Sequence, residues 1–182
     1  PYPDVEAHSW YSNQVATLTN AGILSGFPDG TFGPAKHITR AEFATIAALF
    51  FHAPEVSDDA FSDISSNWAR EYINRAAALG LVSGYPDGTF RPNAEITRAE
   101  VMEIINNVLF RTPDKDHFLG NMITWPDNSN PNAWYYEAVQ EATNSHDYER
   151  VDNTSPETWT EITQPRDWDA LEAELAQKYP DR

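Results

Sequence analysis

A segment of 21 residues occurs twice in this chain of 182 residues. Residues 22–42 read GILSGFPDGTFGPAKHITRAE, and residues 80–100, 58 positions further on, read GLVSGYPDGTFRPNAEITRAE. Fourteen of the 21 positions are identical, and the alignment needs no gap. Such a duplication predicts one supersecondary unit that is built at least twice, with function between the copies rather than inside one. It therefore favours a modular binding domain over a single enzyme active site.

The composition excludes several classes of partner. The formal charge of −16, from 28 acidic and 12 basic side chains, argues against nucleic acid, which requires basic surfaces, and against adhesion to an anionic membrane. No run approaches about 18 consecutive apolar residues, so we expect no membrane insertion. The absence of cysteine excludes disulfides, thiol catalysis and zinc–thiolate sites. The five histidines show no metal-ligand spacing, and we predict no metal and no cofactor.

Each expected repeat begins with an aromatic-x-Asp element that is followed by a tryptophan. These residues are Asp4, Asp63 and Asp127, and Trp10, Trp68 and Trp134. Apolar residues at helical spacing then predict a helix in every unit. In the first two units the helix is expected to end at Gly22 and Gly80, because glycine suits the left-handed conformation that terminates many helices.

A glycine-containing turn and a second helix complete each of the first two units. In residues 25–32 and 83–90, Pro-Asp-Gly predicts a turn, since proline presets φ, aspartate bonds its own backbone and glycine accepts positive φ. A threonine followed three residues later by glutamate then predicts a capping box at the start of each second helix. The pairs are Thr39–Glu42 and Thr97–Glu100. The capping box explains both glutamates, so we assign them a structural role.

Three repeats are expected: residues 1–52, residues 53–111, and residues 112–182, which contain a linker and a divergent third repeat. Asp127 and Trp134 align with the earlier units, but the glycine turn and the arginine-containing box are replaced. A closing helix is still expected near the end of the chain, with an inner face of Trp168, Leu171 and Leu175.

Taken together, these motifs resemble the S-layer homology (SLH) domain. The resemblance rests on the aromatic-x-Asp start, the tryptophan, the Gly-aromatic-Pro-Asp-Gly-Thr-Phe loop and the Ile-Thr-Arg-Ala-Glu box, which recur in the same order. It is strong in the first two units and partial in the third. It implies a mainly α fold, in which three helix-loop-helix repeats are arranged with pseudo-threefold symmetry around a central three-helix bundle, with grooves between neighbours.

The resemblance also implies a function. SLH domains attach exported proteins noncovalently to the bacterial cell wall, and their usual ligand is a secondary cell-wall polysaccharide, often with a pyruvate ketal on a terminal N-acetylmannosamine. In some lineages modified peptidoglycan is bound instead. We therefore expect an extracellular, non-enzymatic, monomeric module at the cell wall or S-layer. The chain opens at Pro1, inside the first repeat, and we interpret it as a piece of a larger surface protein.

Arg40 and Arg98 are the first candidates for ligand contact. Each follows an expected helix N-cap, where the positive end of the helix dipole disfavours a cation by about 0.3–1 kcal/mol. That placement, repeated in an acidic chain, favours an anionic ligand that the guanidinium group binds in bidentate fashion. The alternative is a pair of solvated surface arginines.

The remaining candidates each have a structural alternative. The three repeat tryptophans either pack in the core or cover the apolar face of a sugar ring. Gly26 and Gly84 either permit positive φ or tight packing, or let the sugar approach backbone amides. The three repeat aspartates accept hydrogen bonds from sugar hydroxyls or cap the turn at the start of each repeat. The resemblance favours ligand contact, with Trp134 completing a groove that starts at Arg98.

Two other functions compete with wall anchoring. A glycan-processing enzyme would need two carboxylates at fixed separation in one cleft, and the sequence singles out no such pair. His146-Asp147 lacks a nucleophile elbow, so no catalytic triad is predicted. The second alternative that remains open is a self-assembly module, in which the outward-facing loops and helices of the repeats form lattice contacts between proteins.

Overall fold

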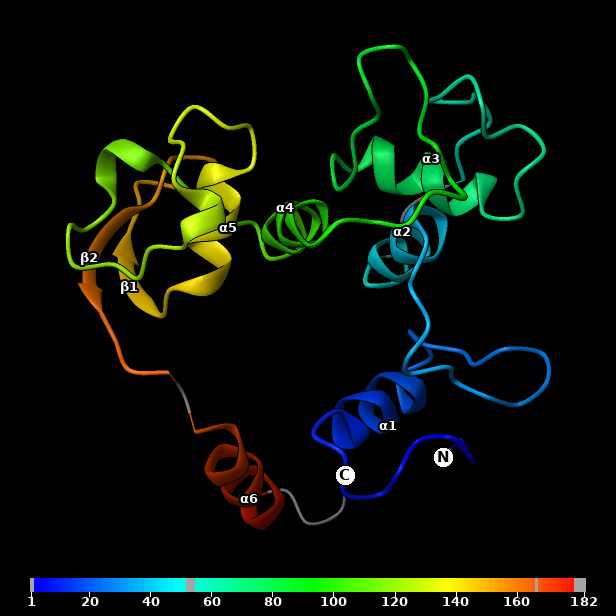
Figure 1. Cartoon of the computed structure of the whole chain (residues 1–182), viewed down its shortest axis with the longest axis horizontal. Coiled ribbons are helices and arrows are strands. Elements are labelled where there is room, and N and C mark those ends of the chain that lie inside the picture. Colours follow the sequence, from blue (N-terminus) through cyan, green and yellow to red (C-terminus); the bar gives the residue numbers. More distant parts are fainter. Residues whose placement is uncertain (1, 52–54, 166, 179–182) are drawn as a thin grey trace. The chain divides into compact units, whose positions relative to one another are not determined.

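The computed structural model describes residues 2–51, 55–165 and 167–178, which form two compact units (Figure 1). The first unit, Pro1–Val108, contains α1 (Ser12–Asn20), α2 (Arg40–Leu49), α3 (Arg70–Ala78) and α4 (Arg98–Val108). The second unit, Leu109–Arg182, contains the short turns η1 (Lys115–His117) and η2 (Pro126–Asn128), then α5 (Tyr136–Thr143), β1 (His146–Glu149), β2 (Thr158–Ile162) and α6 (Trp168–Lys178). The structure is mainly helical, which confirms the predicted fold class.

Helix C-termini in the first two repeats form as the glycines predict. Gly22 and Gly80 have φ of 73° and 70°, a region that side chains disfavour. After α1, the N–H of Gly22 donates to Thr19 O and that of Ile23 to Leu18 O at 2.9 Å. This is the Schellman pattern, which satisfies carbonyls that the end of the helix leaves free.

The predicted capping boxes are confirmed at both second helices. The N–H of Thr39 donates to Glu42 Oε2 at 2.7 Å, and the N–H of Glu42 donates back to the threonine hydroxyl at 3.2 Å. The same pair of bonds joins Thr97 and Glu100, at 2.8 and 3.3 Å. Both glutamates therefore have the structural role that was predicted.

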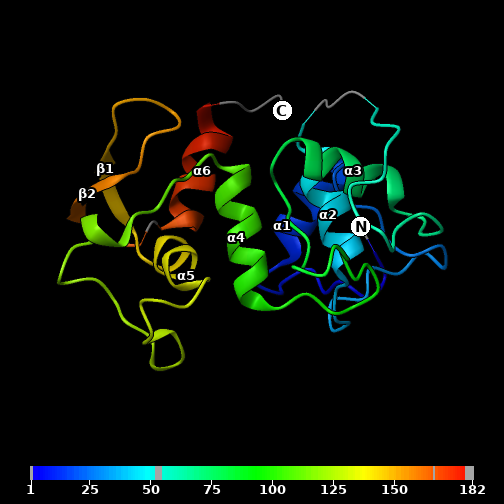
Figure 2. The same ribbon diagram turned by 90° about the horizontal axis from the view of Figure 1, so that it is seen from above.

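The core of the first unit forms where α2 and α3 lie side by side (Figures 1 and 2). The buried face of α2 is made of alanines, which allow a second helix to approach closely. Ile73 of α3 and Phe90 of the second glycine loop fill the space with side chains that are 0% and 1% exposed. The other members of this cluster are Ala41, Ala44, Ala47, Ala48, Ile64, Ala69, Ala76, Leu81, Val82, Ile104 and Val108.

Each of the first two repeats closes by bringing its first aromatic residue onto its own glycine loop. Tyr2 lies 5.3 Å from Phe32, and Phe61 lies 5.1 Å from Phe90, between ring centroids. The aromatic ring also covers the glycine before the turn. A Cβ atom on Gly84 would lie 2.5 Å from Phe61 Cε1 and 2.7 Å from the carbonyl oxygen of Thr89, and Gly26 is equally crowded by Tyr2.

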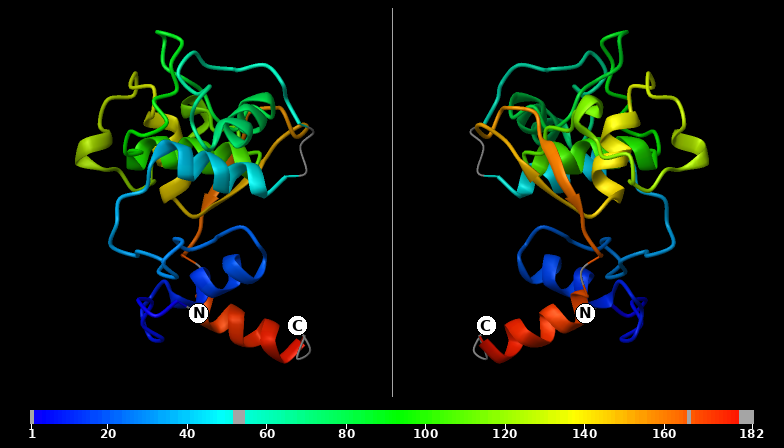
Figure 3. Two further views of the ribbon diagram at one scale, coloured as in Figure 1. Left: turned by 90° about the vertical axis from the view of Figure 1, so that its right-hand side faces the viewer. Right: turned by 90° about the vertical axis from the view of Figure 1, so that its left-hand side faces the viewer.

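The second unit differs from the first two repeats after its first helix. In place of a glycine loop it has an antiparallel hairpin of β1 and β2, with an irregularity between Asp147 and Tyr148 (Figure 3). Trp159 of β2 is 2% exposed, and its ring stacks on His146 at 4.0 Å and contacts Phe118 at 4.5 Å, between centroids. The hairpin therefore builds its own small core.

The predicted closing helix is present as α6. Its proposed inner face cannot be compared in full, because the side chains of Trp168 and Leu175 lie outside the described residues. Among the helices of residues 2–51, 55–165 and 167–178, none has the length and apolar character of a membrane span. The pseudo-threefold arrangement and the boundaries of the three repeats stay predictions.

We predict that Gly84→Ala and Gly26→Ala each destabilise the first unit by about 1–3 kcal/mol, because the new methyl group meets a ring and a fixed carbonyl oxygen. Urea unfolding followed by circular dichroism measures the effect. Gly120→Ala is the control, since a Cβ there meets nothing within 4 Å and the backbone is not left-handed. Equal stability of all three variants would contradict the packing interpretation.

Candidate functional site

A groove of about 680 Å³ lies in the first unit, between the first glycine loop, α2 and the tryptophan of the second repeat. Its walls are mainly apolar, with Phe27, Ile46 and Trp68 among them. Gly26 lies in the wall that the loop forms. The structure thus brings two of the predicted residues, Gly26 and Trp68, to one groove.

All three repeat tryptophans are exposed. Trp10, Trp68 and Trp134 have exposed fractions of 86%, 63% and 65%, which removes the interpretation that they are core residues. Trp10 meets Tyr11 edge-on at 5.4 Å, and Trp134 meets Tyr135 with the same distance and the same interplanar angle of 89°. The third repeat therefore preserves the local geometry of the first at this position, although its loop has changed.

Arg40 is buried and makes contacts with the second repeat. Its Nη1 lies 2.5 Å from Oε1 of Glu100, its Nε donates to Phe90 O at 2.8 Å, and its Nη2 donates to Ser83 O at 3.1 Å. The guanidinium group also lies over the Tyr85 ring at 4.9 Å. The anion that faces Arg40 in this structure is thus the carboxylate of Glu100. Contact between Arg40 and a ligand stays a prediction.

Arg98, the repeat counterpart of Arg40, is in a different environment. It is the first residue of α4 and its side chain is exposed. Within the part of the chain that the structure describes, its guanidinium group makes no hydrogen bond or ion pair. Its charge is therefore exposed to solvent, and its predicted contact with an anionic ligand stays a prediction.

The glycines before the turn are explained by close packing. Neither Gly26 nor Gly84 has the positive φ that was one alternative. Instead both lie against the first aromatic residue of their repeat, so a side chain has no room. Gly26 also lines the groove, whereas the groove does not include Gly84.

Two of the predicted aspartates hold the glycine loops closed. The Asp4 carboxylate accepts from the N–H groups of Phe32 and Gly33 at 2.8 and 2.7 Å, which lowers its pKa. Asp63 accepts from Phe90 and Arg91 at 2.8 Å each. These bonds join the start of each repeat to its glycine loop, which is a different role from the predicted capping of the turn at the start of the repeat. Asp127 is exposed in η2.

Sequence reasoning missed a cation at the groove. Lys36 lines it and is exposed, with its ammonium group 3.9 Å from the centre of the Phe27 ring. His37 also lines it and lies 2.9 Å from a carboxylate oxygen of Glu95. The signal was present in the repeat alignment, where Ala94 stands opposite Lys36, so the first repeat alone has a basic residue there.

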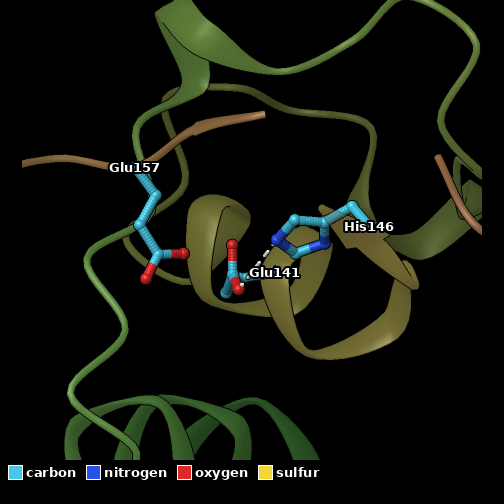
Figure 4. A group of neighbouring side chains, drawn as sticks. All are labelled: Glu141, His146 and Glu157. Carbon is cyan, nitrogen blue, oxygen red and sulfur yellow. Dashed lines mark ion pairs between the residues drawn. The ribbon is translucent and has the colours of Figure 1, made fainter. Parts of the chain in front are cut away.

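A second feature that was missed lies in the core of the second unit. Glu141 of α5, His146 of β1 and Glu157 before β2 converge there, with side chains that are at most 1% exposed (Figure 4). The carboxylate of Glu141 accepts from Trp159 Nε1 at 3.1 Å and from Arg111 Nε at 2.9 Å. These three residues are the donor types from which a metal site is built, although the histidine spacing alone predicted none.

Charge in this cluster is unevenly balanced. Burial acts to raise the pKa of Glu141, but His146, Arg111 and Trp159 outweigh it and hold that pKa below its ordinary value. Burial and the neighbouring charge of Glu141 raise the pKa of Glu157, although Arg111 and Arg150 oppose the shift. Glu157 is therefore the carboxylate that lacks sufficient positive charge around it.

Comparison with known proteins identifies the family. Residues 1–44 and 60–102 match the model of the S-layer homology domain. These two segments belong to the S-layer homology family. The chain is 36% identical to the cellulosome-anchoring protein of Acetivibrio thermocellus over 88% of this chain and 36% of that protein. It is 34% identical to cell surface glycoprotein 1 of the same organism over 81% of this chain and 7% of that protein. It is 32% identical to the S-layer protein EA1 of Bacillus anthracis over 57% of this chain and 12% of that protein.

Membership of the SLH family indicates attachment to the cell wall and an extracellular location at the cell surface, as predicted. The SLH domain is an anchoring module rather than a catalytic one. Some relatives are enzymes, but the match covers only 6% and 11% of two of them. The chain spans about a third or less of the relatives named above.

We predict effects of very different size on stability for the two repeat arginines. Arg40→Ala should lower the free energy of unfolding by about 3–5 kcal/mol, because it leaves the largely buried carboxylate of Glu100 without its cation. Arg98→Ala should change it by less than about 0.5 kcal/mol, since its side chain is exposed. Chemical denaturation measures both. Similar losses for the two variants would contradict the difference in environment.

Acid should destabilise the first unit through its loop carboxylates. Bonds from Thr89 and Arg91 lower the pKa of Asp87 to about 2 from an ordinary 3.8, so folding favours its charged form. This stabilisation is complete above about pH 4 and is lost as the pH falls toward 2. Urea titrations at pH 5, 4, 3 and 2.5 measure the free energy of unfolding. This energy should fall less with acid for Asp87→Asn than for the unchanged chain, and an equal fall in both would contradict the prediction.

Proposed function

We propose that this chain binds a pyruvylated secondary cell-wall polysaccharide and so anchors a larger surface protein without a covalent bond. The observation that carries the proposal is the groove in the first unit, where an exposed tryptophan and an exposed lysine border the same space. An aromatic face and a cation are the two groups that a sugar carrying a carboxylate requires.

Trp68 is the proposed platform for the sugar ring. Its indole is 63% exposed beside the groove, and burying it under a ligand removes apolar surface from water. Lys36 is the proposed partner for the ketal carboxylate in this groove, because it is exposed and bordered by apolar walls. Gly26 lines the same groove as Trp68 and Lys36, and its lack of a side chain leaves room there for the sugar.

Arg98 is the proposed carboxylate ligand of the second repeat, because its guanidinium group is exposed and its planar fork matches a carboxylate. Arg40 stays in the proposed site on a different condition. A ligand carboxylate would have to replace Glu100, which now lies 2.5 Å from its Nη1. The other proposed ligand contacts are Trp10, Trp134, Gly84 and the three repeat aspartates. Asp4 and Asp63 have less capacity to accept bonds from a sugar, because they already accept from backbone amides.

We predict that Trp68→Ala and Arg98→Ala each weaken polysaccharide binding about 10- to 100-fold, as expected for a lost stacking surface and a lost charge-assisted hydrogen bond. Calorimetry with purified wall polysaccharide measures this. Matched controls are Trp125→Ala, which changes a 37% exposed tryptophan that does not line the groove, and Arg70→Ala, which removes the same charge from a surface ion pair. Both controls should bind like the unchanged chain.

Chemical removal of the pyruvate ketal from the polysaccharide should weaken binding by the unchanged chain about as much as Arg98→Ala does. The same removal should weaken binding by Arg98→Ala little further. Binding to whole walls that survives hydrofluoric acid, which strips phosphate-linked polysaccharide, would instead favour peptidoglycan or self-assembly. Released reducing ends would indicate hydrolysis. Unchanged binding in the tryptophan and arginine variants would remove these residues from the site.

A further inference from the structure

The buried cluster of the second unit has the geometry of a metal-binding site. Ligand atoms of Glu141, His146 and Glu157 lie within 4.8 Å of one another (Figure 4). His146 Nε2 lies 3.2 Å from Glu141 Oε1. Two ligand atoms of one tetrahedral Zn²⁺ ion are separated by about 3.3 Å, given bonds of about 2.0–2.1 Å. One pair of the cluster therefore already has the required separation.

The orientation of the imidazole supports this assignment. Nδ1 of His146 lies 2.8 Å from the carbonyl oxygen of Asn144, so this nitrogen carries a proton and donates. In the neutral ring Nε2 then presents a lone pair to the carboxylates. Metal-binding histidines are commonly oriented in this way, with the second nitrogen donating to a backbone carbonyl.

Two atoms of the cluster have no hydrogen-bond partner although they are buried. They are His146 Nε2, which has an ion-pair contact with Glu141 Oε1 at 3.2 Å, and Glu157 Oε2, which has one with Arg111 Nε at 3.7 Å. The side chains of both residues are 0% exposed. Burying a polar atom without a hydrogen bond is unfavourable, so two such atoms around one point indicate a missing shared partner.

We propose that Glu141, His146 and Glu157 bind a divalent transition-metal ion of the Zn²⁺ class. One imidazole nitrogen and two carboxylates form a suitable ligand set for such an ion, and the nitrogen disfavours calcium, which prefers oxygen ligands. The ligands come from α5, β1 and the segment before β2. Bound metal thus joins the hairpin to α5 where the first two repeats have a glycine loop.

Two arginines compete with the metal for the same carboxylates. Arg111 Nε lies 2.9 Å from Glu141 Oε1 and 3.7 Å from Glu157 Oε2, and Arg150 Nη1 lies 3.4 Å from Glu157 Oε1. Arg111 has a side chain that is 25% exposed, so it can turn toward solvent when a dication enters. Removal of Arg111 should therefore tighten metal binding, which distinguishes a metal site from an ion-pair network that is complete by itself.

The experiment uses the whole chain, stripped with a chelator and titrated with Zn²⁺ by calorimetry. We expect one ion per chain, at least tenfold weaker binding in His146→Gln and in Glu157→Gln, and at least threefold tighter binding in Arg111→Gln. The control is His117→Ala, which removes an exposed histidine that lies 2.9 Å from Asp114. It should bind as the unchanged chain does. Circular dichroism identifies any variant that does not fold.

Co²⁺ in the unchanged chain provides a readout that needs no variant. A tetrahedral site with nitrogen and oxygen ligands should give intense visible absorption that Zn²⁺ abolishes. Absence of that absorption would overturn the proposal. Zn²⁺ binding that persists in both His146→Gln and Glu157→Gln would also overturn it, since the ions would then be adventitious ones on the acidic surface. Weaker binding in Arg111→Gln would overturn it as well.

Discussion

The fold of the first unit depends on a guanidinium group that one repeat inserts into the next. Arg40 leaves the start of α2 and bonds the carbonyl oxygens of Ser83 and Phe90 and the carboxylate of Glu100. All three partners belong to the second repeat. A charge in that position is stable only when each of its donors has an acceptor, so the two repeats must adopt one register. The groove beside Trp68 depends on this register, because its walls come from both repeats.

Identical sequence boxes thus have different physical roles. Arg98 occupies in its box the place that Arg40 occupies in the first, yet it is exposed. The sequence that follows each box also differs: Arg40 is followed by a repeat with a glycine loop and a second glutamate box, and Arg98 by a repeat in which both are replaced. Within the first unit, the same box therefore holds one buried arginine and one exposed arginine.

Local features were predictable because their causes lie within a few residues. The capping boxes, the left-handed Gly22 and Gly80 and the Asp87 turn each depend on contacts within about four positions, and the structure contains them. Arg40 was different, since Glu100 is 60 residues away and no local pattern shows that the two meet. The role of Asp4 in holding the glycine loop was not predicted, because the amides that donate to it are 28 and 29 residues further on.

The unforeseen parts of both sites share a physical cause. Lys36 interrupts the repeat pattern, so the recurring motifs that predicted the site did not include it. The cluster of Glu141, His146 and Glu157 has no recognisable spacing, because a hairpin rather than a helix face brings its members together. Buried carboxylates are costly unless cations surround them, so a chain with 28 acidic groups that places two in one core must supply compensation there. Both departures from the repeat pattern therefore introduce charged groups at a proposed binding site. Lys36 is exposed at the groove, and the cluster of Glu141, His146 and Glu157 lies in the core of the second unit.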